Sequence, residues 1–371
     1  MRILYFSRDY TTHDFRFLKS LSKSEHQVYF LRLEKKNRQL EDRPIPENII
    51  QVQWLGGKQE VKIWDGLRLF FDLKRVIRDI QPDLIHAGPI QTCAFLTALT
   101  GFKPLVSMSW GSDLLKDADR NKFYEWVTRY TLKRSTVLIG DCQAVWDKAV
   151  SFGFSPKNVV LFPWGIDLKR FTPGKNKTFR ERRGWTENFV MLSLRSWEPI
   201  YGLEVLAKAF VIAAREVPDL RLILLGGGSL APMIRSIFEQ NQLSDRVYFG
   251  GQTPQKELPG YYQAADLYLS ASHSDGSSVS LMEALGSGLP VLVSDIPGNK
   301  EWIKAGKQGW LFRDGNVADL AEKMVQAYQY RFELNTMGQK ARQLAESRAD
   351  WNKNFEILLS AYRLAIKRVK R

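Results

Sequence analysis

Cysteine, histidine and long hydrophobic runs are all scarce in this chain of 371 residues. Its two cysteines, Cys93 and Cys142, form no CxxC or Cys/His cluster, so neither a disulfide framework nor a structural zinc site is expected. No run approaches the ~20 apolar residues of a membrane-spanning helix, and the apolar start at residues 3–6 is too short for the core of a signal peptide. A cytoplasmic location is therefore expected.

Negative charge is also in short supply, because 40 acidic residues face 54 basic ones and the net charge is +14 at pH 7. The excess is spread over both halves of the chain and would attract an anionic membrane or an acidic glycan, and a generally basic surface with no dedicated partner is the alternative. No zinc finger, basic zipper or RNP motif is present, so no nucleic-acid partner is predicted. Residues 123–134, with their aromatic and basic side chains, are interpreted first as a helix packed against the core, and peripheral contact with the inner face of a membrane is the alternative.

The chain is longer than a usual single core, so two domains are expected. In each half, short apolar runs alternate with stretches of helical periodicity, which is typical of a doubly wound α/β sheet. The expected strands are residues 2–7, 27–33, 50–55, 84–87, 105–109, 137–140 and 159–162, then 189–194, 221–225, 247–249, 267–269, 290–293 and 309–312; the expected helices lie near 15–22, 67–80, 92–100, 121–134, 143–152, 204–216 and 233–241.

A junction between the halves is visible in residues 162–174, FPWGIDLKRFTPG, where two prolines and two glycines disfavour both strand and helix. The last segment shows helical periodicity again, in Phe355, Leu358 and Tyr362. The predicted domains are therefore residues 1–165 and 166–350, followed by a helix over residues 351–371.

Two carboxylates mark the most informative stretch, residues 272–302. Asp275 opens a short Gly/Ser turn, Glu283 lies in an apolar run, and seven residues separate them. The pattern predicts a turn, a helix, a break at Gly286 and Gly288, and a buried strand. Free amides at a helix start bind anions, so a diphosphate is expected there, and Glu283 suits the two hydroxyls of a ribose.

A helix joining Asp275 to Glu283 would hold the two acids ~12 Å apart. The carboxylates of a retaining glycosidase instead flank a single scissile bond. The spacing therefore favours holding both ends of a nucleotide sugar, and it argues against a hydrolase.

This stretch resembles the nucleotide-sugar site of retaining glycosyltransferases of family 4, whose pattern is Glu-x7-Glu and here is Asp-x7-Glu. Residues 295–302, Asp-x-x-Gly-x-x-Glu-Trp, and the junction motifs at 164–167 and 171–173 add to the resemblance. It implies the GT-B fold: two Rossmann-like, doubly wound domains facing a cleft, the first binding the acceptor and the second the nucleotide sugar, with a C-terminal helix crossing back to the first. It also implies transfer with retention, without a protein nucleophile, a metal or a cofactor.

On the donor side, the resemblance assigns the diphosphate to Arg195, which ends a strand, and to the amides after Asp275, whose own carboxylate accepts from hydroxyls of the sugar. The family pairs that arginine with a lysine before a glycine, but Tyr201 stands here, so Arg195 would carry more of the charge. Gly251 falls in the loop that reads the base through its backbone, which does not separate UDP from GDP or ADP; a UDP-sugar is favoured. Residues 226–229 either approach the nucleotide or form a tight turn. The turn backbone assigned to the donor is that of Gly276, Ser277, Ser278 and Val279.

On the acceptor side, the family has a Gly-Gly loop after the first strand, whereas residues 11–14 contain no glycine. His13 is the expected substitute, and a capping or solvated histidine is the alternative. Asp113 is the candidate for orienting the acceptor hydroxyl, or else an N-cap. Trp110 either stacks on a sugar or belongs to the core, and His86 is expected to face the interdomain cleft.

The leading hypothesis is a retaining glycosyltransferase that moves a sugar from a nucleotide-sugar donor to a saccharide or lipid-linked acceptor, in the synthesis of a cell-surface polysaccharide or glycoconjugate. The alternative is a catalytically weakened nucleotide-sugar-binding protein that acts as a partner subunit. The missing lysine, the missing glycines and the shortened first acid motivate that alternative.

Overall fold

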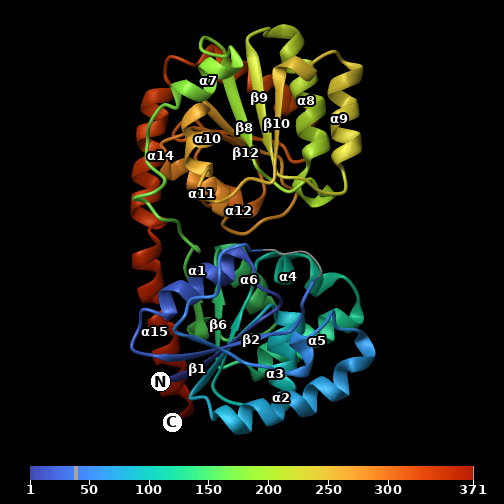
Figure 1. Cartoon of the computed structure of the whole chain (residues 1–371), viewed down its shortest axis with the longest axis vertical. Coiled ribbons are helices and arrows are strands. Elements are labelled where there is room, and N and C mark those ends of the chain that lie inside the picture. Colours follow the sequence, from blue (N-terminus) through green and yellow to red (C-terminus); the bar gives the residue numbers. More distant parts are fainter. Residues whose placement is uncertain (37–40, 371) are drawn as a thin grey trace. The chain divides into compact units, whose positions relative to one another are not determined.

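The computed structural model describes residues 1–36 and 41–370, so the predicted final segment is described up to residue 370. The chain divides into two compact units (Figure 1): unit 1 comprises residues 1–162 and 355–371, and unit 2 comprises residues 163–354. Each unit is a parallel sheet covered by helices. Both sheets carry the predicted Rossmann-like architecture, and the fold class is confirmed.

Unit 1 contains a seven-stranded sheet in the order β3-β2-β1-β4-β5-β6-β7, and each neighbouring pair is parallel. Its central strands are buried along their whole length, because helices pack on both faces. The elements are β1 (Arg2–Ser7), α1 (Thr12–Leu21), β2 (Gln27–Arg32), β3 (Ile49–Gln51), α2 (Gly66–Ile80), β4 (Leu84–Gly88), α3 (Phe95–Thr100), β5 (Leu105–Met108), α4 (Ser112–Leu115), α5 (Lys122–Arg134), β6 (Val137–Gly140), α6 (Gln143–Ser151) and β7 (Val159–Leu161).

Two local features of unit 1 differ from expectation. Helix α1 begins at Thr12 rather than Phe15, because Thr11 and Asp14 form a capping box: the Thr11 amide and hydroxyl donate to the Asp14 carboxylate at 2.9 and 2.6 Å. The expected helix at 92–100 is instead a π-helical turn, Ile90–Ala94, followed by α3.

Unit 2 contains a six-stranded parallel sheet in the order β10-β9-β8-β11-β12-β13. Its core lies between the sheet and the inward faces of α8 and α13. The elements are α7 (Lys177–Arg183), β8 (Phe189–Ser193), α8 (Leu203–Glu216), β9 (Leu220–Leu225), α9 (Ala231–Gln240), β10 (Val247–Gly251), α10 (Leu258–Ala264), β11 (Leu267–Ser270), α11 (Val279–Gly286), β12 (Val291–Ser294), α12 (Pro297–Lys300), β13 (Gly309–Phe312), α13 (Val317–Gln329) and α14 (Leu334–Arg348).

The last helix, α15 (Trp351–Val369), begins in unit 2 and belongs to unit 1 from Phe355 onward. Its Tyr362 hydroxyl lies 2.6 Å from Nδ1 of His86 in strand β4. A buried polar contact therefore fixes this helix to the first sheet.

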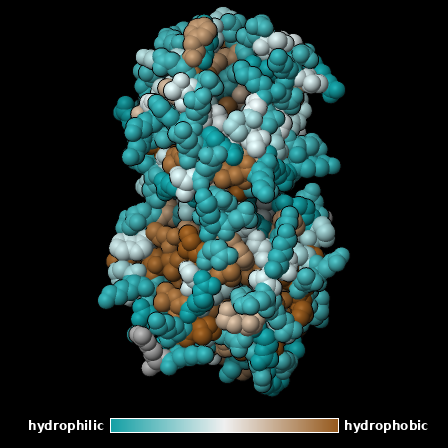
Figure 2. Space-filling view, turned by 90° about the vertical axis from the view of Figure 1, so that its left-hand side faces the viewer, coloured by the Kyte–Doolittle hydropathy of each residue, from teal (hydrophilic) through white to brown (hydrophobic). Residues whose placement is uncertain are grey.

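The surface is mostly hydrophilic on the face drawn in Figure 2, where brown hydrophobic patches interrupt teal side chains. Both cysteines are buried and free. In the described part of the chain, no helix is both long and apolar enough to cross a bilayer.

Candidate functional site

Charged and hydroxyl side chains converge at the carboxyl edge of the unit 2 sheet, in the loops after β8 and β11. The strand order reverses between these two neighbours, since β9 lies on the other side of β8. In doubly wound sheets ligands bind in the crevice at such a switch point. Arg195 follows β8 and Asp275 follows β11, so both residues lie at this edge.

Arg195 lies at the centre of this cluster. Its Nη2 donates to Asp275 Oδ2 at 2.6 Å, and its Nη1 donates to Ser278 Oγ at 2.8 Å and to Ser280 Oγ at 3.1 Å. The Arg195 side chain is 12% exposed and that of Asp275 is 22% exposed. The sequence singled out both residues but did not reveal that they pair with each other. One guanidinium thus joins the loop after β8 to the loop after β11.

The Arg195 guanidinium keeps its positive charge. Burial opposes the charge, but the adjacent Asp275 carboxylate and nearby tyrosines outweigh burial, and the pKa of Arg195 is raised. Its Nε is buried and has no hydrogen-bond partner among the described residues. The Tyr201 ring lies 4.4 Å from the Arg195 Cζ, measured to the ring centroid. Tyr201 therefore contacts the cation through its ring face, in the manner of a cation–π pair.

Helix α11 begins at Val279, four residues after Asp275. Residues 275–278 precede the helix as the predicted turn, so α11 spans only part of the interval from Asp275 to Glu283. Gly298 accounts for that turn: a Cβ at this position would lie 2.6 and 2.5 Å from the carbonyl oxygens of Asp275 and Gly276. The turn therefore packs directly against the backbone of α12.

The two serines before α11, Ser277 and Ser278, have different hydrogen-bond partners. Ser277 Oγ accepts a hydrogen bond from Trp302 Nε1 at 3.0 Å. Ser278 is the N-cap residue, but its side chain makes no capping hydrogen bond. Its hydroxyl instead accepts a hydrogen bond from Arg195. Ser278 therefore does not cap the first amides of α11, and the positive end of the helix lies beside a guanidinium.

Glu283 is 2% exposed, in the middle of α11. The Tyr262 hydroxyl donates to its Oε2 at 2.9 Å, and Gln255 Nε2 lies 3.4 Å from its Oε1. Burial, followed by the Glu283 charge, raises the pKa of Tyr262 well above its usual range, so this phenol remains a donor. The carboxylate is thus oriented by a buried tyrosine.

Three residues of this network were not singled out by sequence reasoning: Ser280, Tyr262 and Tyr268. The Tyr268 hydroxyl lies 2.7 Å from Ser280 Oγ, so strand β11 supports the serine that binds Arg195. Both tyrosines lie in apolar stretches, and the sequence carries no signal for their contacts. Ser280 had one local signal, because Ser278 and Ser280 flank the first residue of the predicted helix.

The two glycine loops of unit 2 lie next to each other. Gly251 ends β10 in a left-handed conformation, and its carbonyl accepts from the Gly226 amide at 2.6 Å. Ser229 donates to both carboxylate oxygens of Glu198, in the loop that follows Arg195. The loop at 226–229 is therefore tied to the segment that carries Arg195.

In unit 1, Asp113 is buried and accepts hydrogen bonds on both oxygens. Oδ1 accepts from Ser109 Oγ at 2.6 Å and from the Leu114 amide at 3.0 Å, and Oδ2 accepts from the Ile90 amide at 3.0 Å. Burial raises the pKa of Asp113, and these hydrogen bonds oppose the rise. The N-cap interpretation was wrong, because Gly111 occupies that position and Asp113 lies inside α4.

His13 was expected in a loop. It lies instead in the first turn of α1, because the capping box starts the helix at Thr12. Its ring lies 5.2 Å from that of Trp110, centroid to centroid. Trp110 is half-buried and also packs on Phe17. The structure thus brings His13 and Trp110 together.

The expectation that His86 faces a cleft was wrong, since its exposed fraction is 0%. Its Nε2 lies 3.2 Å from Met108 Sδ, and its ring packs edge-on against Tyr5. Burial lowers the pKa of His86 to about 3. This residue belongs to the unit 1 core.

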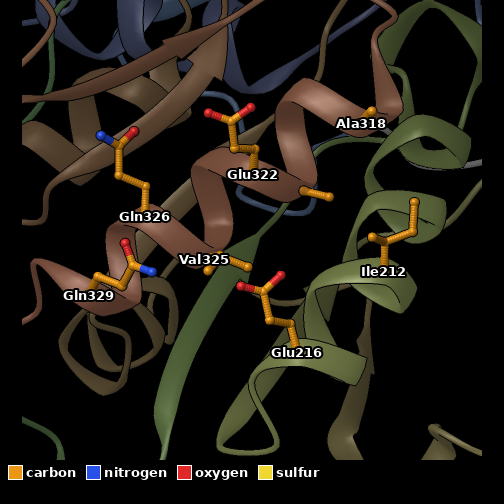
Figure 3. Close-up of a pocket in the computed structure, with 8 residues that line it drawn as sticks. Ile212, Glu216, Ala318, Glu322, Val325, Gln326 and Gln329 are labelled. Carbon is orange, nitrogen blue, oxygen red and sulfur yellow. The ribbon is translucent and has the colours of Figure 1, made fainter.

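A groove of about 420 Å³ lies between α8 and α13 in unit 2 (Figure 3). Its lining runs along α13 from Ala318 to Gln329 and does not include Arg195 or Asp275. Elsewhere in residues 1–36 and 41–370, no three His, Cys, Asp or Glu side chains gather as metal ligands do. The candidate site is therefore the charged cluster around Arg195.

Two doubly wound parallel sheets, with a charged cluster at the switch point of the second, are the architecture of the GT-B fold. Residues 2–142 match the family model Glycosyl transferase 4-like, and residues 175–344 match the model Glycosyl transferases group 1. The first match lies in unit 1 and the second in unit 2. Together they support a GT-B glycosyltransferase of the group 1 and family 4-like type.

Curated relatives align with parts of the chain. It is 34% identical to the GtfA subunit of the UDP-N-acetylglucosamine–peptide N-acetylglucosaminyltransferase of Streptococcus pneumoniae, over 39% of this chain and 29% of that protein. It is 25% identical to the UDP-Gal:alpha-D-GlcNAc-diphosphoundecaprenol alpha-1,3-galactosyltransferase of Escherichia coli, over 59% of this chain and 58% of that protein. The chain thus spans less than two thirds of the length of either relative.

Solved structures share the fold over nearly the whole chain. The crystal structure of Anabaena Alr3699/HepE in complex with UDP-glucose superposes with a TM-score of 0.81 at 19% identity, covering 98% of this chain and 100% of that one. A likeness at this identity shows the shared GT-B fold and no more.

Proposed function

We propose that the protein is a retaining glycosyltransferase that takes a UDP-sugar as donor. The observation that carries this proposal is the Arg195 cluster, in which a buried guanidinium meets Asp275 and the uncapped start of α11 at a topological switch point. A cation beside free helix amides is a site for a diphosphate. The UDP-glucose bound to Alr3699/HepE supports the choice of nucleotide, and that contact belongs to the other protein.

In this proposal Arg195 and the amides at the start of α11 bind the diphosphate, through Gly276, Ser277, Ser278 and Val279. Glu283 accepts the ribose hydroxyls, Asp275 accepts a hydroxyl of the transferred sugar, and the backbone at Gly251 faces the base. Charge builds on the departing diphosphate in the transition state, so preorganised donors beside it lower the barrier without a metal.

We propose the following reaction at these contacts. The bond from the anomeric carbon to the phosphate oxygen breaks, and that oxygen takes the proton of the acceptor hydroxyl on the same face. The acceptor oxygen then bonds to the anomeric carbon, so configuration is retained and no protein nucleophile is needed. Because Tyr201 replaces a second cation, Arg195 carries most of the leaving-group stabilisation.

For the acceptor we propose a saccharide or a lipid-linked saccharide, in cell-surface polysaccharide or glycoconjugate synthesis, with peripheral contact to an anionic membrane. The diphosphoundecaprenol substrate in the name of the Escherichia coli relative supports this class. On the acceptor side we propose that His13, beside Trp110, contacts the acceptor. Because both Asp113 oxygens are engaged, we propose that Asp113 positions the 109–115 segment.

Two substitutions test the donor site. Arg195→Ala should lower kcat about 10²–10³-fold, because one preorganised donor to the developing charge is lost. Glu283→Gln should raise the donor Kd about tenfold with a smaller change in kcat, because a charge-assisted hydrogen bond is weakened. Titration calorimetry with UDP-sugars and a product assay measure the two effects. Arg183→Ala and Glu216→Gln are the matched controls, and unchanged kinetics in both site variants would contradict the assignment.

A nucleotide-sugar-binding partner subunit is the second candidate. The pairing of Arg195 with Asp275 favours it, because that cation is already neutralised and no lysine stands at position 201. Incubation with UDP-, GDP- and ADP-sugars separates the two functions. Tight binding without hydrolysis or transfer identifies the subunit, whereas release of UDP with retained configuration in the product identifies the transferase.

A further inference from the structure

Helix α2 of unit 1 has an unusual outer face. Leu67 is 76% exposed and Phe71 66% exposed, and Trp64, in the turn before the helix, is 74% exposed. Large apolar side chains with this exposure are costly on a surface that meets only water, and a run of them marks an interaction site.

The helix places these side chains opposite its core face. Leu69, Leu73 and Val76 are buried and hold α2 against the unit 1 core. Leu67 and Phe71 are one turn apart and lie about half a rotation from Leu69, so they form the centre of the solvent face. Sequence periodicity alone would assign that centre to polar residues.

Cations continue and flank the same stripe. Lys74 and Arg78 follow Leu67 and Phe71 at helical spacing and are exposed. Lys62 Nζ lies 5.5 Å from the Trp64 ring centroid. Asp79 and Asp72 lie along one flank, where both pair with Arg75, and Asp79 Oδ1 also lies 3.2 Å from Arg78 Nε. The stripe thus runs from an apolar end to a cationic end.

We propose that this stripe, Trp64–Leu67–Phe71–Lys74–Arg78, is the surface through which the protein lies on an anionic lipid bilayer. A Trp, Leu and Phe group with Lys and Arg beside it suits the boundary between head groups and acyl chains. Acidic head groups complement both the local cations and the net charge of +14. The proposal rests on the proposed function only for its purpose, which is to bring the enzyme to a lipid-linked acceptor.

Helix α5 carries the competing surface. Phe123 and Trp126 are 58% and 51% exposed there, and the Trp126 ring packs on Tyr130 at 5.7 Å and on Phe95 at 5.9 Å between centroids. On α2 the Phe71 ring packs on that of Phe70 at 5.3 Å, but the three apolar side chains of the α2 stripe are each more exposed than Phe123 or Trp126. The α2 stripe therefore offers the more available apolar surface.

Co-sedimentation with vesicles tests the proposal. We expect binding to vesicles of phosphatidylcholine mixed with phosphatidylglycerol, and much weaker binding to phosphatidylcholine alone. The double variant Leu67→Ser/Phe71→Ser should reduce the partition coefficient at least tenfold, and Lys74→Gln/Arg78→Gln should reduce it less and flatten its dependence on salt. Phe332→Ser, at an 84% exposed aromatic of unit 2, is the matched control and should bind as the parent does.

A second readout reports insertion. Both native cysteines are buried, so a dye can be attached at Arg68→Cys, and its emission should shift to the blue on anionic vesicles. Circular dichroism and the thermal shift with UDP-sugar establish that each variant is folded and binds donor. Retained donor binding with lost vesicle binding supports the proposal separately from the proposed function. Undiminished vesicle binding by Leu67→Ser/Phe71→Ser would overturn it, as would loss caused instead by Phe123→Ser/Trp126→Ser.

Discussion

The first six strands of each sheet follow the same spatial order, but the fourth strand has a different role in each unit. In unit 1 that strand is β4, and its His86 binds Tyr362 of the C-terminal helix. In unit 2 the strand is β11, and its Tyr268 binds Ser280 at the start of α11. The polar side chain of this strand thus attaches the C-terminal helix in unit 1, whereas in unit 2 it supports a candidate ligand site.

The sheet edges differ in the same sense. In unit 1 the carboxylates of Asp14 and Asp113 accept hydrogen bonds from nearby hydroxyls and amides. Asp9 pairs with Arg32, whose Nε donates to the Glu34 carbonyl oxygen, so the charges at this edge serve local structure. In unit 2 Asp275 is paired with a guanidinium that has a further donor unused. The common fold therefore does not determine where a functional site lies; the side chains at the strand ends determine it.

The largest expected effect concerns acid stability, because unit 1 buries a histidine in its core. The pKa of His86 falls from 6.5 to about 3 through burial. The unfolded chain takes up a proton below pH 6.5 and the native one does not, so stability is unaffected above pH 6.5 and falls as the pH drops toward 3. The loss is about 1.4 kcal/mol per pH unit and roughly 5 kcal/mol in total. Urea unfolding between pH 7.5 and pH 4 measures it.

His86→Gln is the control, because glutamine does not titrate and can still bond to Tyr362. It should lower stability at pH 7.5 yet flatten the slope with pH. Asp14 and Asp113, whose pKa values are raised by burial, remain in both proteins and cancel in the difference. Equal slopes of unfolding free energy against pH for parent and variant would show that burial of His86 does not cause the loss of stability in acid.

The next effect concerns the turn after the first strand of each sheet. Unit 2 uses Gly202, with φ of +61°, where a Cβ would lie 2.0 Å from the Ala271 carbonyl oxygen. Unit 1 uses Asp9, with φ of +63°, whose carboxylate accepts from the Tyr10 amide. Gly202→Ala should cost about 3 kcal/mol of stability, because a strained φ is added to a clash with backbone. Thermal or urea unfolding measures the cost.

Gly184→Ala is the matched control for that substitution. Gly184 has φ of +66° but nothing within 4 Å of a built Cβ, so only the backbone term of about 1 kcal/mol remains. Because Gly202 precedes α8 and follows Tyr201, Gly202→Ala should also weaken UDP-sugar binding. Similar costs at the two glycines would mean that the turn can shift away from β11.

The fold was largely predictable from the sequence. Alternating apolar runs located β1, β6 and β13 to the residue, because buried parallel strands are continuous in hydrophobicity. Helix starts were less predictable: α1 begins earlier through a capping box, which needs Asp14 to turn back onto Thr11.

The candidate site was predictable only in its components. Arg195, Asp275 and Glu283 stood out as charges beside apolar strands, but their partners come from far along the chain and carry no local pattern. Tyr262 and Glu283, 21 residues apart, meet only after α10 and α11 pack. His86 shows the converse error, since a polar residue near a strand end was assigned to a cleft although its own helix partner, Tyr362, lies 276 residues away.

Substitutions at Tyr201 should have the smallest effect, and they test whether its ring or its hydroxyl supports Arg195. In unit 1 the hydroxyls of Thr11 and Ser109 bind the nearby carboxylates. Tyr201 contacts Arg195 through its ring, 4.4 Å from Cζ, and no hydrogen bond from its hydroxyl is found in the described residues. Tyr201→Phe should therefore change the donor Kd and kcat less than twofold, whereas Tyr201→Ala should cost about 1 kcal/mol, or roughly fivefold in kcat/KM, through loss of the cation–π contact. Steady-state kinetics with a UDP-sugar measure both. If phenylalanine fails as badly as alanine, the hydroxyl rather than the ring supports the site, and the contrast between the two edges is weaker than the geometry indicates.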